Sequence, residues 1–214
     1  MIGQEDWAGE TEERVITAAL PRVRTLGWTR SLVVAAARDV GLSAADAELL
    51  FPGGARDLAA LLSARHDRAA LAALSEIDAA ALKVRERIRR AVLARCEAAM
   101  VDEAAVRRLV AWLTFPANLA LGLRLVWVSA DRLWRWAGDE ATDENHYSKR
   151  ALLAEILIST LAIRLAGGEA AAASHLDQRI AGVMAFERWK GGIKPAAFAG
   201  RLAAAFGRMR YGRP

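Results

Sequence analysis

The segment between Trp134 and Arg150 gathers side chains that are suited to binding a partner. Tyr147 and Arg150 lie one helical turn apart, and Asp143 lies one turn before Tyr147, so we expect the three on one helical face. An aromatic anchor surrounded by charged groups is typical of binding hot spots. The sequence therefore predicts a partner-binding surface formed by Trp134, Asp139, Asp143, His146, Tyr147 and Arg150.

A simpler interpretation is that this segment only ends one helix and starts the next. Gly138 can end a helix in the left-handed conformation, and Thr142 can cap the following helix, with Asp143 in its first turn. Helix capping explains the glycine and the acids. It does not require Trp134 or Tyr147.

Catalytic patterns do not stand out in the sequence. His66, His146 and His175 are far apart and match no metal-binding spacing, and no phosphate-binding glycine-rich loop is present. Cys96 has no histidine near it in sequence and lies in the helical pattern 91–100, where a packed core thiol is expected. We therefore predict a protein that is not an enzyme and that uses no metal and no cofactor.

Composition indicates one all-α domain. The chain has 214 residues, of which 54% are hydrophobic, and it is rich in alanine with only five prolines. The lone cysteine excludes an intramolecular disulfide and favours a reducing compartment. The acidic N-terminus resembles no targeting peptide, and the uncharged run 109–123 is shorter than the ~20 residues that span a membrane. The expected location is cytoplasmic, with peripheral membrane association.

Periodicity and punctuation predict about ten helices that position these residues. The expected ranges are 11–26, 29–40, 44–51, 55–77, 83–100, 102–113, 117–137, 143–166, 170–189 and 195–210. We divide the chain into a disordered acidic N-terminus (1–10), a helix-turn-helix-like region (11–51), a helical bundle (52–190), and a hinge with a basic helix (191–214).

Two motifs resemble a known family. The pattern W-x-x-A-G-D-x-x-T-D-x-N-x-Y-x-x-R runs from Trp134 to Arg150, and Gly41-Leu42-Ser43 is followed by Phe51-Pro52. Both resemble the accessory lipid-binding proteins of ubiquinone biosynthesis, which have a TetR-regulator-like helical fold. The resemblance implies a non-catalytic protein that binds an isoprenoid or quinone lipid and presents a quinone precursor to the demethoxyubiquinone hydroxylase. It also implies a homodimer, and contact between the hydroxylase and the Trp134–Arg150 segment. Where the family commonly has tryptophan, this chain has His146.

The helix-turn-helix-like region is expected to be vestigial. Its second helix, 44–50, carries Asp46 and Glu48, and Gly54 stands where TetR-type proteins have a lysine. Carboxylates repel the DNA phosphates that such helices must approach, so we expect no nucleic-acid partner. The alternative function is a TetR-type transcriptional regulator that senses a hydrophobic ligand in its bundle.

Two helices that are apolar almost all round, 117–137 and 143–166, are expected at the centre of the bundle. Apolar stripes most often form an ordinary packed core. The family resemblance, however, implies a lipid cavity among them. The predicted lipid-binding residues are Trp112, Leu113, Phe115, Leu119, Leu123, Trp127, Leu153, Ile156, Leu157 and Leu161.

The C-terminal segment has the pattern of a helix that lies on a membrane. From Arg188 onward it carries seven basic residues and no acidic one, so the net charge of +5 belongs to this tail. Apolar residues at helical spacing flanked by cations are typical of helices that insert into an anionic surface. The alternative is a last helix that packs on its own bundle or on a second subunit. The predicted membrane-binding residues are Lys194, Phe198, Arg201, Leu202, Phe206, Arg208 and Met209.

Overall fold

The chain folds into helices joined by short connections. The computed structural model describes residues 2–139 and 144–192, and within these ranges every regular element is helical, which confirms the all-α prediction. The elements are α1 (Ile2–Leu26), α2 (Arg30–Asp39), α3 (Ala44–Leu50), α4 (Ala55–Leu74), the 3₁₀ turn η1 (Ala79–Ala81), α5 (Val84–Met100), α6 (Glu103–Leu113), α7 (Pro116–Trp136) and α8 (Glu144–Gly192).

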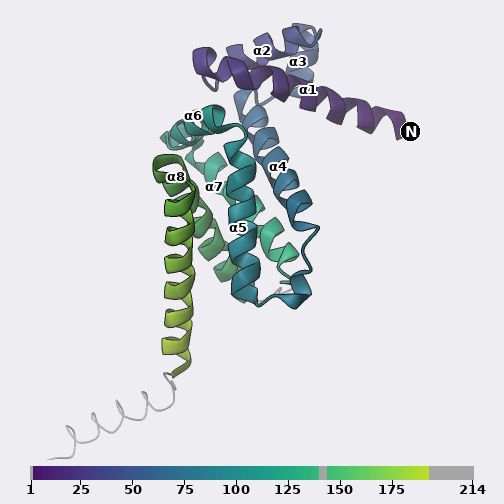
Figure 1. Ribbon diagram of the computed structural model, residues 1–214. Helices are drawn as coiled ribbons and strands as arrows, with labels where there is room; N and C mark the ends of the chain where they lie inside the picture. Colours follow the sequence, from purple (N-terminus) through teal and green to yellow (C-terminus); the bar gives the residue numbers. More distant parts are fainter. Residues whose placement is uncertain (1, 140–143, 193–214) are drawn as a thin grey trace, which may run out of the picture.

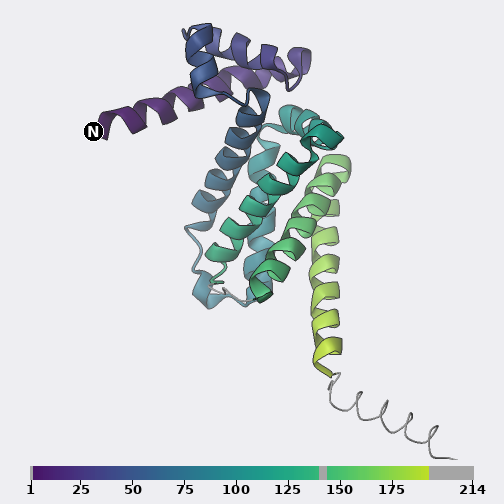
Figure 2. The ribbon, with the colours of Figure 1, turned by 180° about the vertical axis from the view of Figure 1, so that it is seen from behind.

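Helix α8 reverses direction at Gly168. This residue has φ 81° and ψ −172°, a conformation that essentially only glycine adopts at low cost. We predicted separate helices at 143–166 and 170–189. In the structure they are two antiparallel arms of α8, before and after Gly168 (Figure 2).

Two large hydrophobic cores and a small cluster of Ala99, Val106 and Leu165 hold together the helices drawn in Figure 1. The upper core joins α1 and α2 to the beginnings of α4 and α7, and Trp28 donates its indole N–H to the Ala105 carbonyl of α6 at 3.4 Å. The lower core joins the end of α4 to α5, the end of α7 and both arms of α8. The upper core contains residues from both sides of the boundary that we predicted between residues 51 and 52. The helix-turn-helix-like region therefore packs directly on the bundle.

The N-terminus differs from the expectation. Residues 2–10, which we predicted to be disordered, are helical and continuous with the rest of α1. A helix that is already anchored by buried Val15 and Ile16 extends at low cost through a segment without proline. Acidic residues near its start are also favourable with the helix dipole.

The short helix α3 carries its two acids in defined roles. Asp46 and Ser43 form a reciprocal capping box, in which the Ser43 hydrogen bonds lower the pKa of Asp46, and Glu48 pairs with Arg30 of α2. The turn before α3 places Gly41 at φ 84°. The likeness of α1 to α3 to a TetR-type DNA-binding unit, and the absence of a nucleic-acid partner, stay predictions.

One stretch of α8, Tyr147–Ala185, is long and apolar enough to cross a membrane by length and composition alone. The reversal at Gly168 divides this stretch into its two arms. The first arm contributes Leu153, Ile156 and Leu157 to the lower core, so we interpret it as a core helix.

Candidate functional site at the junction of α7 and α8

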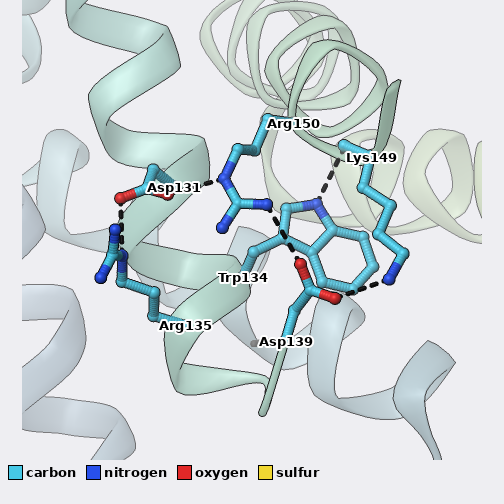
Figure 3. Close-up of polar contacts among 6 residues, drawn as sticks. All are labelled: Asp131, Trp134, Arg135, Asp139, Lys149 and Arg150. Atoms are coloured by element: carbon cyan, nitrogen blue, oxygen red, sulfur yellow. Dashed lines mark hydrogen bonds and ion pairs between the residues drawn. The ribbon is translucent and has the colours of Figure 1, made fainter. Parts of the chain in front are cut away.

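A network of ion pairs ties the end of α7 to the start of α8 (Figure 3). Arg150 donates from Nε to Asp131 Oδ1 at 2.6 Å and from Nη1 to Asp139 Oδ2 at 3.1 Å. Lys149 Nζ lies 2.6 Å from Asp139 Oδ1, and Arg135 Nε lies 2.8 Å from Asp131 Oδ2. Each carboxylate thus faces two cations.

Because its central residue is buried, this network holds α7 and α8 together and does not offer that residue to a partner. Arg150 is only 1% exposed, although it is a charged residue, and its pairing with two carboxylates offsets the cost of removing it from water. Burial alone would raise the pKa values of Asp131 and Asp139. The hydrogen bonds from Arg150, with those from Arg135 and Lys149 respectively, outweigh burial and lower both pKa values. Both carboxyls are therefore ionised at neutral pH.

Trp134 is fixed by the same network. Its indole Nε1 donates to the Lys149 carbonyl at 2.9 Å, and Lys149 Nζ lies 5.7 Å from the ring centroid in a cation–π contact. The signature tryptophan is therefore held in one orientation by the first turns of α8 (Figure 3).

Trp134 forms one wall of a cavity of about 310 Å³ at the lower end of the bundle. The start of α5 and both arms of α8 supply the other walls. Of the lining residues that the structure describes, two are basic and nine are apolar: Lys83, Arg85, Val84, Ile88, Trp134, Leu152, Leu153, Ile156, Ile180, Val183 and Met184.

The chemistry of this cavity suits an apolar ligand. Its volume lies at the lower end of the range for small-molecule sites, roughly 300–1,000 Å³, and such sites are predominantly apolar with few polar groups. Val84 and Met184 are 53% and 45% exposed, so the rim opens to solvent. A larger groove of about 1060 Å³ lies between α1 and α4, but charged side chains such as Glu10, Glu13 and Arg65 line it, and it does not suit a lipid.

The predicted lipid-binding residues do not all converge on this cavity. Leu153 and Ile156 line it. Leu157 is buried nearby in the lower core, with Leu161 packed against it, whereas Trp112 and Leu113 pack against the upper core. Phe115, Leu119 and Leu123 lie on the surface, 64%, 50% and 55% exposed, and are not part of an internal cavity in this structure.

These exposed side chains belong to a second feature, which we call the outer face. It consists of Phe115, Leu119, Leu123 and Trp127 on α7 with Tyr147 and Ile158 on α8. Trp127 is half-buried, and its ring stacks on Tyr147 with centroids 6.3 Å apart. Large apolar side chains exposed on neighbouring helices in this way are typical of an interaction surface.

The structure also divides the predicted partner-binding residues. Tyr147 is 67% exposed, as a partner contact requires, but Arg150 is buried and Asp139 is largely covered. Positions three apart on a helix differ by about 60° in direction. On this turn of α8, Tyr147 faces solvent and Arg150 faces the interior. The expectation that Arg150 contacts a partner therefore does not fit this structure. Asp143 and the side chain of His146 lie outside the described residues, as do the predicted membrane-binding residues Lys194 to Met209.

Sequence reasoning missed Asp131, Lys149 and most of the cavity lining. A usable signal for Asp131 was present, because a buried charge in an apolar helix needs an opposite charge on its neighbour, and Arg150 is such a charge. No sequence signal pointed to Ile180 or Val183, because their place in the cavity follows from the reversal at Gly168.

Other titratable groups lie apart from the site. Burial raises the pKa of the Cys96 thiol to about 12, consistent with the packed core thiol that we expected. Among the described side chains, no group of three or more His, Cys, Asp or Glu could hold a metal ion.

Comparison with known proteins places this site in a family. Residues 119–187, which include Trp134 and the whole ion-pair network, match the family model COQ9. "Ubiquinone biosynthesis protein COQ9, mitochondrial" from Bos taurus is 31% identical over 170 residues, covering 74% of this chain and 53% of that protein. The protein of the same name from Homo sapiens is 30% identical over 168 residues, with the same two coverages. The chain belongs to the COQ9 family.

The COQ9 relatives extend beyond the matched region. "Ubiquinone biosynthesis protein COQ9-B, mitochondrial" from Xenopus laevis is 28% identical over 174 residues, covering 75% of this chain and 58% of that protein. The chain thus spans about half the length of the COQ9 proteins it matches. Those relatives are named as mitochondrial, and the cytoplasmic location predicted for this chain stays a prediction.

Proposed function

We propose that this COQ9-family protein is a non-catalytic accessory protein of ubiquinone biosynthesis that holds an isoprenoid quinone precursor. The observation that carries the proposal is the apolar cavity beneath the α7–α8 junction, one wall of which is the signature residue Trp134. The names of the relatives supply the pathway. The cavity supplies a place for a ring and the first part of an apolar chain, and the rest of a long isoprenoid would extend past the open rim.

The outer face supports the second half of the proposal, presentation to a hydroxylase. Tyr147 offers an exposed aromatic anchor whose ring stacks on Trp127. The same two helices, α7 and α8, also supply walls of the cavity. A hydroxylase docked at Tyr147 would therefore sit near the bound precursor. The buried ion pairs of Arg150 act behind this surface, because they fix the first turn of α8 from which Tyr147 projects.

We propose that a second copy of the chain binds the end of the outer face that is formed by Phe115, Leu119 and Leu123. Phe115, Leu119 and Leu123 recur every four residues along α7, and burying such a row removes apolar surface from water. Light scattering should then give twice the chain mass for the wild type and a single chain mass for Leu119→Asp with Leu123→Asp. A wild-type monomer would remove the dimer from the proposal.

The test of the function is the quinone content of cells that lack this protein. They should contain less ubiquinone and should accumulate a precursor that awaits hydroxylation, and the wild-type gene should restore both levels. Val183→Trp, which fills the cavity, and Tyr147→Ala, which removes the anchor, should each restore them poorly. Ala181→Trp, an exposed position on the same arm outside the cavity, is the matched control. Unchanged ubiquinone in the deletion strain would reject the proposed pathway.

A further inference from the structure

The mouth of the cavity carries two cations that pair with no carboxylate among the side chains the structure describes. Lys83 and Arg85 line the cavity at the beginning of α5 and are exposed to solvent. Within the described part of the chain, neither side chain forms an ion pair. Two other arginines of α5 are engaged: Arg89 pairs with Asp177, and Arg95 pairs with Asp67.

The acids that the structure describes near the cavity are engaged elsewhere. Asp139 is paired with Lys149 and Arg150, and Asp177 is paired with Arg89. Glu86, near the mouth, accepts a hydrogen bond from the Lys83 backbone N–H at 3.3 Å. None of the eleven lining residues is acidic. Among the described residues, the mouth therefore has an excess of positive charge directly beside an apolar interior.

We infer that the ligand of this cavity is an amphiphile with an anionic headgroup, a carboxylate or a phosphate, which Lys83 and Arg85 bind while the apolar chain enters between Trp134, Ile156 and Val183. This inference rests on the proposed lipid site and narrows its ligand, because a quinone precursor meets it only if its headgroup carries a carboxylate or a phosphate. A neutral lipid would gain the apolar contacts but would leave both cations without a partner. An anion gains both, and the guanidinium of Arg85 can bind two oxygens of a carboxylate or phosphate at once.

The two possible sources of the anion differ in chemistry and can be separated. A carboxylated lipid carries one negative charge near pH 7, whereas a phosphate monoester carries close to two. Both fit two cations, and the tighter binder identifies the source.

The experiment uses the purified full chain and three probes with the same tail: oleyl alcohol, oleate and oleyl phosphate, below their aggregation concentrations. Calorimetry should show that at least one anionic probe binds roughly tenfold more tightly than oleyl alcohol. Each exposed ion pair raises the affinity by up to about a factor of five, and two cations are present. Lys83→Gln with Arg85→Gln should remove that advantage and leave the affinity for oleyl alcohol unchanged. Arg90→Gln, on the exposed face of α5 outside this cavity, is the matched control and should bind as wild type does.

The outcomes separate the two levels of the proposal. Equal affinity for all three probes in the wild type, or an anion preference that survives Lys83→Gln with Arg85→Gln, overturns the headgroup inference and leaves the lipid site standing. If no probe binds, or if Val183→Trp binds every probe as the wild type does, the lipid site itself is wrong.

Discussion

At the scale of single residues, Arg150 is the side chain on which the site depends most. It is 1% exposed and ion-paired with both Asp131 and Asp139. Arg150→Met should lower the free energy of unfolding by about 3 kcal/mol, because it leaves two covered carboxylates with one cation fewer each. The melting temperature should fall by roughly 6–12 °C for a chain of this length.

Tyr147→Ala is the control for Arg150→Met, since it changes the same helical turn at an exposed position. Its melting temperature should stay within a few degrees of the wild-type value. Equal melting temperatures for Arg150→Met and the wild type would show that the buried ion pairs do not hold α7 to α8.

His66 makes the stability of the fold depend on pH. Burial, and the charge of Arg95, lower the pKa of His66 to about 4, although the hydrogen bond to Asp102 opposes this shift. The unfolded chain binds the proton more readily, so stability is complete above about pH 6.5 and falls as the pH decreases toward 4. Over this range we expect a loss of about 3 kcal/mol, measured by urea unfolding at several pH values.

The matched variant for this pH dependence is His66→Gln, which keeps a hydrogen-bonding group facing Asp102 but does not titrate. Its free energy of unfolding should change much less between pH 6.5 and 4 than that of the wild type. Parallel curves for the two proteins would mean that His66 is not the group responsible.

At the scale of elements, the reversal of α8 depends on Gly168. A side chain there meets no atom within 4 Å, so its cost comes from the backbone conformation alone. Gly168→Ala should therefore destabilise the protein by about 1–3 kcal/mol. Gly182→Ala, in the second arm and also free of contacts, should instead stabilise it by up to about 1 kcal/mol, because alanine favours helix.

In chemical denaturation, the free energy of unfolding should therefore fall for Gly168→Ala and rise for Gly182→Ala. A Gly168→Ala protein as stable as the wild type would imply that α8 continues without the reversal. The cavity would then lose the wall formed by Ile180 and Val183.

Helix ends were largely predictable from sequence, but the direction of each helical face was not. Punctuating residues such as Gly41 before α3 and Pro116 at the start of α7 placed boundaries within a few residues. Helix α7 is apolar almost all round, so periodicity did not reveal that Leu121 and Leu133 face the cores while Leu119 and Leu123 face solvent. That choice is made by the neighbouring helices, and so most of the predicted lipid residues missed the cavity.

At the scale of the whole molecule, the cavity and the end of α8 lie at the same end of the bundle. Ile180, Val183 and Met184 line the cavity, and α8 runs on past the bundle to Gly192 (Figure 1). A C-terminal segment bound to a membrane would therefore bring the rim of the cavity toward the lipid from which its ligand must come.

Removal of residues 193–214 should leave a folded bundle that no longer sediments with anionic liposomes. Full-length protein with Phe198→Asp and Phe206→Asp should behave in the same way, because charged groups oppose insertion of the apolar face. High salt should weaken binding of the wild type only in part, since it screens the basic residues and not the apolar contacts. Equal binding of the truncated and full-length proteins would place membrane association elsewhere.

The central claim is that the cavity beneath the α7–α8 junction holds a lipid, and native mass spectrometry of the purified protein tests it most directly. The wild type and Ala181→Trp should both carry an added mass that extraction identifies as an isoprenoid quinone precursor. Val183→Trp should melt within a few degrees of the wild type and carry no such mass, because the indole occupies the lipid's place. A folded Val183→Trp protein that retains the same added mass as the wild type would contradict the account.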